Sequence, residues 1–111
     1  MRFGRWYPLG EAGDLAPAEE GVLQLRLARG LLDYPTGKSA MVAYRHARDV
    51  RAVAQALARA HGGGDLLCRH LIEFPAATDL AAFCAKLRED FVRRFGRPPI
   101  YDPAIPTPHD P

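Results

Sequence analysis

The residues whose types and spacing could do chemistry lie between Tyr34 and Arg48. Tyr34 precedes residues 35–39, Pro-Thr-Gly-Lys-Ser, and Arg45 follows on what we expect to be a helix. A strand ending in a phenol, a turn at glycine and an arginine on the next helix would bring a proton-transferring group and a guanidinium together. That combination suits a phosphate group. We therefore name Tyr34 and Arg45 as candidate catalytic residues, and Lys38, Arg45 and Arg48 as candidate nucleic-acid contacts.

The same residues also have a purely structural interpretation. A tyrosine at a strand end can cover the core, and a helical arginine can be solvated. Neighbouring Arg48 and Asp49 balance in charge, which is typical of a solvated helix face. The Gly-Lys-Ser tripeptide ending at Ser39 is not a P-loop, because that motif needs an earlier glycine where Leu32 stands. Both interpretations of Tyr34 and Arg45 stay open.

Composition limits the class of protein. The chain has 111 residues, 48% of them hydrophobic, which suits one compact domain. The net charge is only +2, although 13 arginines against two lysines favour bidentate phosphate contacts. No apolar run approaches the roughly 20 residues of a membrane span, and no signal peptide is evident. We expect a cytoplasmic protein that does not enter a membrane.

The first half of the chain predicts a hairpin followed by helix. Residues 21–27 alternate apolar and polar side chains, as a half-buried strand does, and a glycine-containing turn leads to a second strand at 31–34. Ser39 and Asp49 are both suitable N-caps. One long helix or two short ones are therefore expected from Ser39 onward, ending at the triple glycine 62–64.

The second half predicts one more strand and the clearest helix. Residues 66–74 are short, apolar and bounded by glycine and proline, which indicates a strand. Residues 80–95 carry an apolar stripe at helical spacing, after a cap at Thr78 or Asp79 and before a glycine stop. The two cysteines, Cys68 and Cys84, are predicted to be buried core residues rather than a disulfide or metal ligands.

Three segments follow from this pattern. Residues 1–20 are expected to be an irregular arm, because glycine and proline break any period, with Phe3 and Trp6 among its anchors. Residues 21–97 form a single α/β (α+β) domain: a small antiparallel three-stranded sheet with flanking helices, in the order β-β-α(-α)-β-α. Residues 98–111 form a proline-rich extended tail.

That order and its local residues resemble the GIY-YIG nuclease superfamily, from roughly Gly21 to Tyr101. Members open with a Gly-Ile-Tyr strand and a Tyr-Ile-Gly strand. Gly21-Val22-Leu23 occupies the place of the first motif, and Tyr34 to Gly37, with two residues inserted, the place of the second. Arg45, eight residues after Gly37, falls where the family keeps its catalytic arginine.

The resemblance also implies that some of the family's catalytic residues are missing from this chain. Family nucleases cleave a phosphodiester with a tyrosine, an arginine and a glutamate that holds a divalent metal such as Mg²⁺ or Mn²⁺. Leu23 replaces the first tyrosine, and Arg88 falls at the glutamate position. Glu89 lies one residue further, turned by about 100° on a helix, and is the candidate metal ligand. No other cofactor is expected.

We therefore expect a catalytically degenerate GIY-YIG-like domain that binds DNA or RNA weakly. One alternative is an active metal-dependent endonuclease, in which Glu89 or Glu73 takes the metal position. The other is a protein-interaction scaffold that engages a partner through the aromatic arm or the proline-rich tail.

Overall fold

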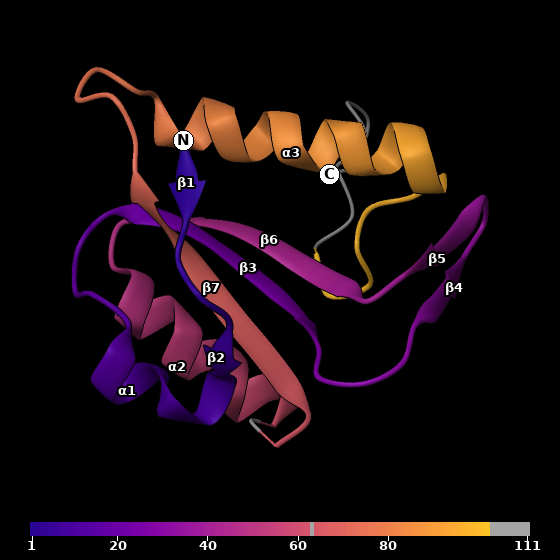
Figure 1. Ribbon diagram of the computed structural model, residues 1–111, viewed down its shortest axis with the longest axis horizontal. Coiled ribbons are helices and arrows are strands. Elements are labelled where there is room, and N and C mark those ends of the chain that lie inside the picture. Colours follow the sequence, from indigo (N-terminus) through magenta and orange to yellow (C-terminus); the bar gives the residue numbers. More distant parts are fainter. Residues whose placement is uncertain (63, 103–111) are drawn as a thin grey trace, which may run out of the picture.

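The fold is an antiparallel β-sheet held between helices (Figure 1). The computed structural model describes residues 1–62 and 64–102. In chain order the elements are β1 (Arg2–Phe3), β2 (Tyr7–Pro8), the 3-10 helix η1 (Leu9–Glu11), α1 (Ala12–Leu15), β3 (Gly21–Leu27), β4 (Leu32–Tyr34), β5 (Gly37–Ser39), β6 (Met41–Ala47), α2 (Val50–His61), β7 (Leu66–Glu73) and α3 (Leu80–Phe95). Helix α3 covers one face of the sheet, and α1 and α2 cover the other (Figure 1).

The main sheet has the strand order β1-β7-β3-β6, and β2 pairs with β7 as well. All pairings are antiparallel. Strands β4 and β5 form a separate hairpin that extends beyond the end of the main sheet (Figure 1). Because β3 lies between β6 and β7, its side chains alternate between the two helical layers. Strands β3 and β7 and helices α2 and α3 follow one another as predicted, but the strand between β3 and α2 in this sheet is β6, which the sequence did not predict.

The prediction of a helix beginning at Ser39 is wrong, because residues 41–47 form strand β6. Leu25 of β3 faces Ala43, and Gly21 faces Ala47. The Ser39 hydroxyl accepts a hydrogen bond from the backbone N–H of Met41 across a turn and caps no helix. The predicted strand at 31–34 belongs instead to the side hairpin β4–β5. Strand β6 is buried on both faces, and this removed the alternation that would have marked it as a strand.

The N-terminal arm is not irregular, and the sheet has more than three strands. Strands β1 and β2 both pair with β7, on the side opposite β3. Leu9, Ala12 and Ala16 are buried against α2 and the sheet. A two-residue strand leaves no periodic signal in the sequence, yet two residues suffice to extend an existing sheet edge.

The remaining predicted elements are confirmed. Strand β3 spans 21–27, β7 spans 66–73, and α2 and α3 begin after their predicted caps, Asp49 and Asp79. Each of these aspartates accepts a hydrogen bond from the backbone N–H three residues later. Cys68 and Cys84 are both buried and free, as predicted.

Apolar side chains form one core on each face of the sheet. On the face of α2, the buried residues include Leu23, Leu25, Val50, Ala54, Leu57, Leu66 and Cys68. On the face of α3, they are Val22, Tyr34, Tyr44, Leu71, Leu80, Cys84 and Phe91. The stripe on α3 therefore packs against the sheet, as its spacing predicts.

Gly96 offers a test of how α3 ends. It adopts φ +87°, and a Cβ atom there would lie 2.9 Å from Cβ of Pro35, whereas Gly30 has φ +78° and open space around it. We expect Gly96→Ala to lower the free energy of unfolding by about 2 kcal/mol or more, and Gly30→Ala by about 1 kcal/mol, because only the first adds a steric collision. Urea denaturation followed by circular dichroism measures both. Equal losses would contradict this packing of Gly96 on Pro35.

Candidate functional site

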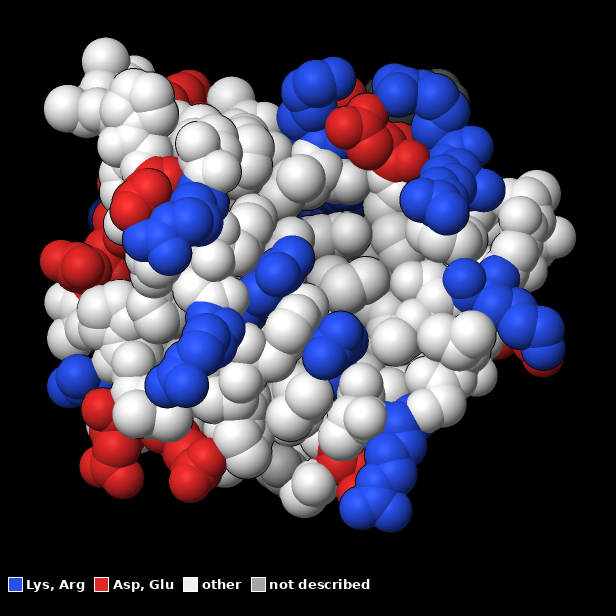
Figure 2. Space-filling view, viewed as in Figure 1, with Lys and Arg blue, Asp and Glu red and all other residues white. Residues whose placement is uncertain are grey.

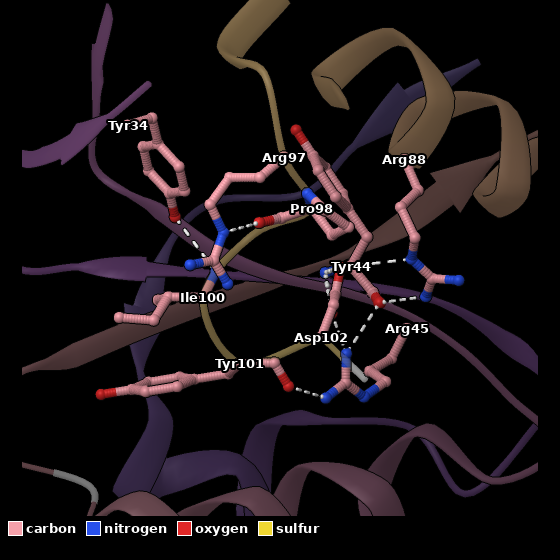
Figure 3. A network of polar contacts seen from close by, with 9 residues as sticks. All are labelled: Tyr34, Tyr44, Arg45, Arg88, Arg97, Pro98, Ile100, Tyr101 and Asp102. Carbon is pink, nitrogen blue, oxygen red and sulfur yellow. Dashed lines mark hydrogen bonds and ion pairs between the residues drawn. The ribbon is translucent and has the colours of Figure 1, made fainter. Parts of the chain in front are cut away.

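Asp102 is a buried carboxylate held by arginines from two different elements. Its side chain is 0% exposed, and it forms ion pairs with Arg45 of β6 and Arg88 of α3. The Nε of Arg88 lies 3.2 Å from Oδ2 of Asp102, and the backbone N–H of Tyr44 donates to Oδ1 at 3.1 Å. Figure 3 shows the two guanidinium groups reaching Asp102 from two sides. We call Asp102, Arg45, Arg88 and the Tyr44 N–H the Asp102 clamp.

The clamp fastens residues 99–102 along the outer edge of β6. The backbone N–H of Tyr101 donates to the carbonyl of Val42 at 2.8 Å. The Tyr101 ring stacks on His61 of α2, with 3.9 Å between ring centroids. Burial raises the pKa of the Asp102 carboxyl, and the neighbouring guanidiniums of Arg45 and Arg88 oppose that shift. The segment thereby covers an edge strand and joins both helical layers to it.

Tyr34 is also tied to this C-terminal segment. Its hydroxyl donates to the carbonyl of Met41 at 2.6 Å and accepts from the backbone N–H of Ile100 at 3.2 Å. The ring packs edge-on against Phe91 of α3, with centroids 5.0 Å apart. Tyr34 is only 7% exposed, and burial raises the pKa of its phenol. A buried phenol with a raised pKa and both hydrogen-bonding roles filled is poorly suited to accept a proton near neutral pH.

Figure 3 shows that the two predicted catalytic residues lie in one network but hold different parts of one segment. Tyr34 holds Ile100, and Arg45 holds Tyr101 and Asp102. Arg45 lies on a strand and not on the predicted helix. Both side chains stabilise the fold in this arrangement, which leaves neither free for a substrate.

The other predicted site residues are scattered. Lys38 lies on the side hairpin, with its Nζ 3.0 Å from a carboxylate oxygen of Asp33. Arg48 is exposed in the link between β6 and α2. Glu89 is exposed on α3, beside Arg88. Within residues 1–62 and 64–102, no group of three or more His, Cys, Asp and Glu is placed to hold a metal. These residues therefore do not fit the divalent metal that the family resemblance implies.

A second cluster, which the sequence did not single out, crosses the sheet on the side of α3. The guanidinium of Arg69 lies 4.8 Å from the ring centroid of Phe3 and 4.5 Å from that of Trp6. The guanidinium of Arg26 lies 4.3 Å from the Trp6 centroid. We call Phe3, Trp6, Arg26 and Arg69 the arginine–aromatic row.

Three strands and one loop position this row. Gln24 of β3 faces Arg69 of β7 directly, and Arg26 lies two residues further on the same face of β3. The Nε of Arg69 donates to Oε1 of Gln24 at 2.7 Å, which fixes the guanidinium against the sheet. Phe3 belongs to β1, and Trp6 lies in the link between β1 and β2. The row therefore depends on the pairing of the N-terminal arm with β7.

The row carries two positive charges without a carboxylate partner. Neither Arg26 nor Arg69 takes part in any ion pair found among the described residues. Burial lowers the pKa of Arg69, and the nearby charge of Arg26 lowers it further. The Nε of Arg26 is buried and has no hydrogen-bond partner in the part of the chain that the structure describes. An external anion that contacts the two half-buried guanidiniums would compensate their positive charge.

The surface around the row is mostly uncharged. Figure 2 shows basic side chains in the middle of the face viewed, over the strands below α3, and acidic ones gathered mainly toward its margins. Sequence reasoning missed the row because Phe3 and Trp6 fall in a segment without periodicity. The available signal was the polar positions Gln24 and Arg26, which alternate with leucines along β3.

Comparison with known proteins adds no family to this picture. No protein-family model matches the chain, and no curated protein matches it significantly. No helix in the described ranges is long and apolar enough to cross a membrane. The geometry and charge of the two clusters are therefore the basis for assigning a function.

Removing the carboxylate of Asp102 should strongly destabilise the protein. Asp102→Asn leaves Arg45 and Arg88 without their counter-ion, so we expect the free energy of unfolding to fall by about 3–5 kcal/mol. Asp33→Asn removes an exposed partner of Lys38 and should change it by about 0.5 kcal/mol or less. Urea denaturation of both variants measures the difference. A loss below about 1 kcal/mol for Asp102→Asn would show that the clamp is not structural.

Stability should also fall steeply in alkali. Burial raises the pKa of Tyr44 to about 12, and the pKa values of Tyr7 and Tyr34 are raised too. As the pH rises above about 10, tyrosines ionise in the unfolded chain before these raised ones ionise in the folded protein, so the free energy of unfolding falls; for Tyr44 the loss between pH 9 and pH 11 is about 1.4 kcal/mol in total. Tyr44→Phe should make this decline shallower by that amount. Urea denaturation at pH 9 and pH 11 measures it; an unchanged decline would contradict the prediction.

Proposed function

We propose that this protein binds nucleic acid through the arginine–aromatic row. The observation that carries the proposal is a pair of half-buried arginines, Arg26 and Arg69, that share an aromatic support and have no carboxylate partner among the described residues. Arg45 and Arg88, by contrast, are neutralised by Asp102. The contrast supports a role for Arg26 and Arg69 in holding an external anion.

A nucleic acid suits the row better than a simple anion does. A phosphodiester supplies oxygen acceptors for guanidinium donors, and Arg26 and Arg69 are both partly exposed. The same nucleotide supplies a flat base, which stacks on aromatic rings and on guanidinium planes. Trp6 and Phe3 are both partly exposed and lie directly against the two cations. The row thus combines both elements of nucleotide recognition.

We propose a GIY-YIG-like order of strands and helices, here called the frame, with the binding surface at the arginine–aromatic row and not at the residues between Tyr34 and Arg48. The order of β3, β6, α2, β7 and α3 supports that frame, with the hairpin β4–β5 as an insertion. Tyr34 and Gly37 then belong to the insertion and not to the second strand of the frame. The involvement of Tyr34 and Arg45 in holding residues 100–102 favours a catalytically inactive domain over an active endonuclease.

Substitutions that each remove one positive charge, from one surface or from the other, can locate the binding surface. We expect Arg26→Gln and Arg69→Gln each to weaken binding of a labelled oligonucleotide about tenfold or more, because each removes a charged hydrogen-bond donor. Lys38→Gln and Arg48→Gln remove the same charge from the surface predicted first and should change affinity by about twofold or less. Fluorescence anisotropy at constant ionic strength measures all four, with circular dichroism to verify folding.

Three outcomes would contradict the proposal. Equal losses from all four variants would indicate nonspecific attraction to positive charge. A loss confined to Lys38→Gln and Arg48→Gln would place the site on the surface predicted first. Metal-dependent cleavage that Tyr34→Phe abolishes would identify an active endonuclease.

A further inference from the structure

We propose that a cleft between the ends of β3 and β7 binds a small organic cation, an ammonium group carried on an apolar body. The cleft has a volume of about 530 Å³. Ligand sites in proteins commonly measure about 300–1,000 Å³ and combine apolar walls with a few polar groups. We call it the strand-end cleft, and its walls include Glu19, Gly21, Val50, His70, Ile72 and Phe74.

The cleft exists because two neighbouring strands separate at one end of the sheet. The pairing of β3 with β7 stops at Leu23 and His70. Beyond that point β3 stays with β6, where Gly21 faces Ala47, and β7 stays with β1. His70 lies on the face of β7 opposite to Arg69, because successive side chains of a strand alternate. The strand-end cleft is therefore separate from the arginine–aromatic row.

Helix α2 holds one wall of the cleft in place. The backbone N–H of Val50 donates to the carbonyl of Glu19 at 3.0 Å, and that of Arg51 donates to the carbonyl of Pro17 at 3.0 Å. Gly21 lies so close to the helix that a Cβ atom there would be 2.7 Å from Cγ2 of Val50. These contacts fix the wall before a ligand arrives, so binding does not have to order it.

The wall supplied by β7 is apolar and exposed. Ile72 is 42% exposed and Phe74 is 38% exposed, although both are large hydrophobic side chains. Both line the cleft, as does the buried Val50 of α2. An apolar ligand body between these side chains would remove hydrocarbon from water on both sides, which is favourable.

The charge around the cleft favours a cation. No lysine or arginine lines it in the part of the chain that the structure describes, although the sequence contains 15 of them. Glu19 is exposed and takes part in no ion pair found within residues 1–62 and 64–102. Glu20 also lines the cleft, and its carboxylate lies 2.7 Å from Nε2 of His46. An ammonium group would pair with Glu19, whereas an anion would be repelled.

His70 does not compete with an ammonium group for Glu19. Its Nδ1 lies 3.4 Å from the hydroxyl oxygen of Tyr7. Burial lowers the pKa of His70, and the charge of Glu19 opposes this shift. The imidazole is therefore mostly neutral at pH 7, which leaves the negative charge of Glu19 uncompensated.

Three probes of similar size and shape test the preference for a cation. At pH 7 phenethylamine is a cation, phenethyl alcohol is neutral and hydrocinnamate is an anion. We would titrate each into the isotope-labelled full chain and follow the backbone amides of Gly21 and Ile72 by NMR. We expect the amine to bind with a Kd of about 1 mM or below. The alcohol should bind about fivefold more weakly, and the anion should not shift these amides.

Two variants with matched controls locate the site. Glu19→Gln should weaken binding of the amine about fivefold and that of the alcohol by less than about twofold, because it removes only charge. Ile72→Ser removes part of the apolar wall and should weaken both about threefold or more. Glu89→Gln and Leu31→Ser change an exposed carboxylate and an exposed apolar side chain outside the cleft and should alter neither affinity. Circular dichroism verifies folding.

Four results would overturn the proposal. Equal affinities for the amine and the alcohol would show that the cleft does not select a cation. Equal losses from Glu19→Gln and Glu89→Gln would indicate nonspecific attraction to negative charge. Shift changes confined to amides outside the cleft would place the amine elsewhere, and no binding of any probe would leave the cleft without this ligand. Because the row lies on the other face, none of these results bears on nucleic-acid binding there.

Discussion

The ion pairing of Asp102 with Arg45 and Arg88 is the interaction on which the rest of the structure depends. A carboxylate with no solvent exposure is stable only when opposite charges and hydrogen-bond donors surround it, and here β6, α3 and the backbone of Tyr44 supply them. The consequence is mechanical. Residues 99–102 are fixed along the edge of β6, which closes one side of the sheet and joins it to both helical layers.

This constraint decides which polar residues remain for function. Arg45 and Tyr34 have the chemistry of a phosphate site, but both hold the C-terminal segment. Arg26 and Arg69 have the same chemistry as Arg45 and no carboxylate among the described residues to neutralise them. The contrast between the neutralised pair, Arg45 and Arg88, and the pair that lies on aromatic rings, Arg26 and Arg69, is the basis on which we propose an anion site at the second pair.

The sequence predicted elements with strong local signals and missed those set by tertiary contact. Asp49 and Asp79 marked helix starts correctly, because an N-cap acts within a few residues. Strand β6 was mistaken for helix, because both its faces are buried and its edge partner lies more than 50 residues away, at Tyr101. The roles of Arg45 and Asp102 depend on that same distant contact. No local pattern could have revealed them, and the prediction for residues 103–111 lies outside the described residues.

The central claim is that Arg45 is structural and Arg69 is available to a ligand. The most direct measurement is a backbone and side-chain amide NMR titration of the full chain with oligothymidylate. We expect chemical-shift changes at the Trp6 indole N–H, the Gln24 side-chain amide and the backbone of β3 and β7, with the Tyr44 and Ile100 amides unmoved. Changes centred on Tyr44 and Ile100, with the Trp6 indole unaffected, would contradict it.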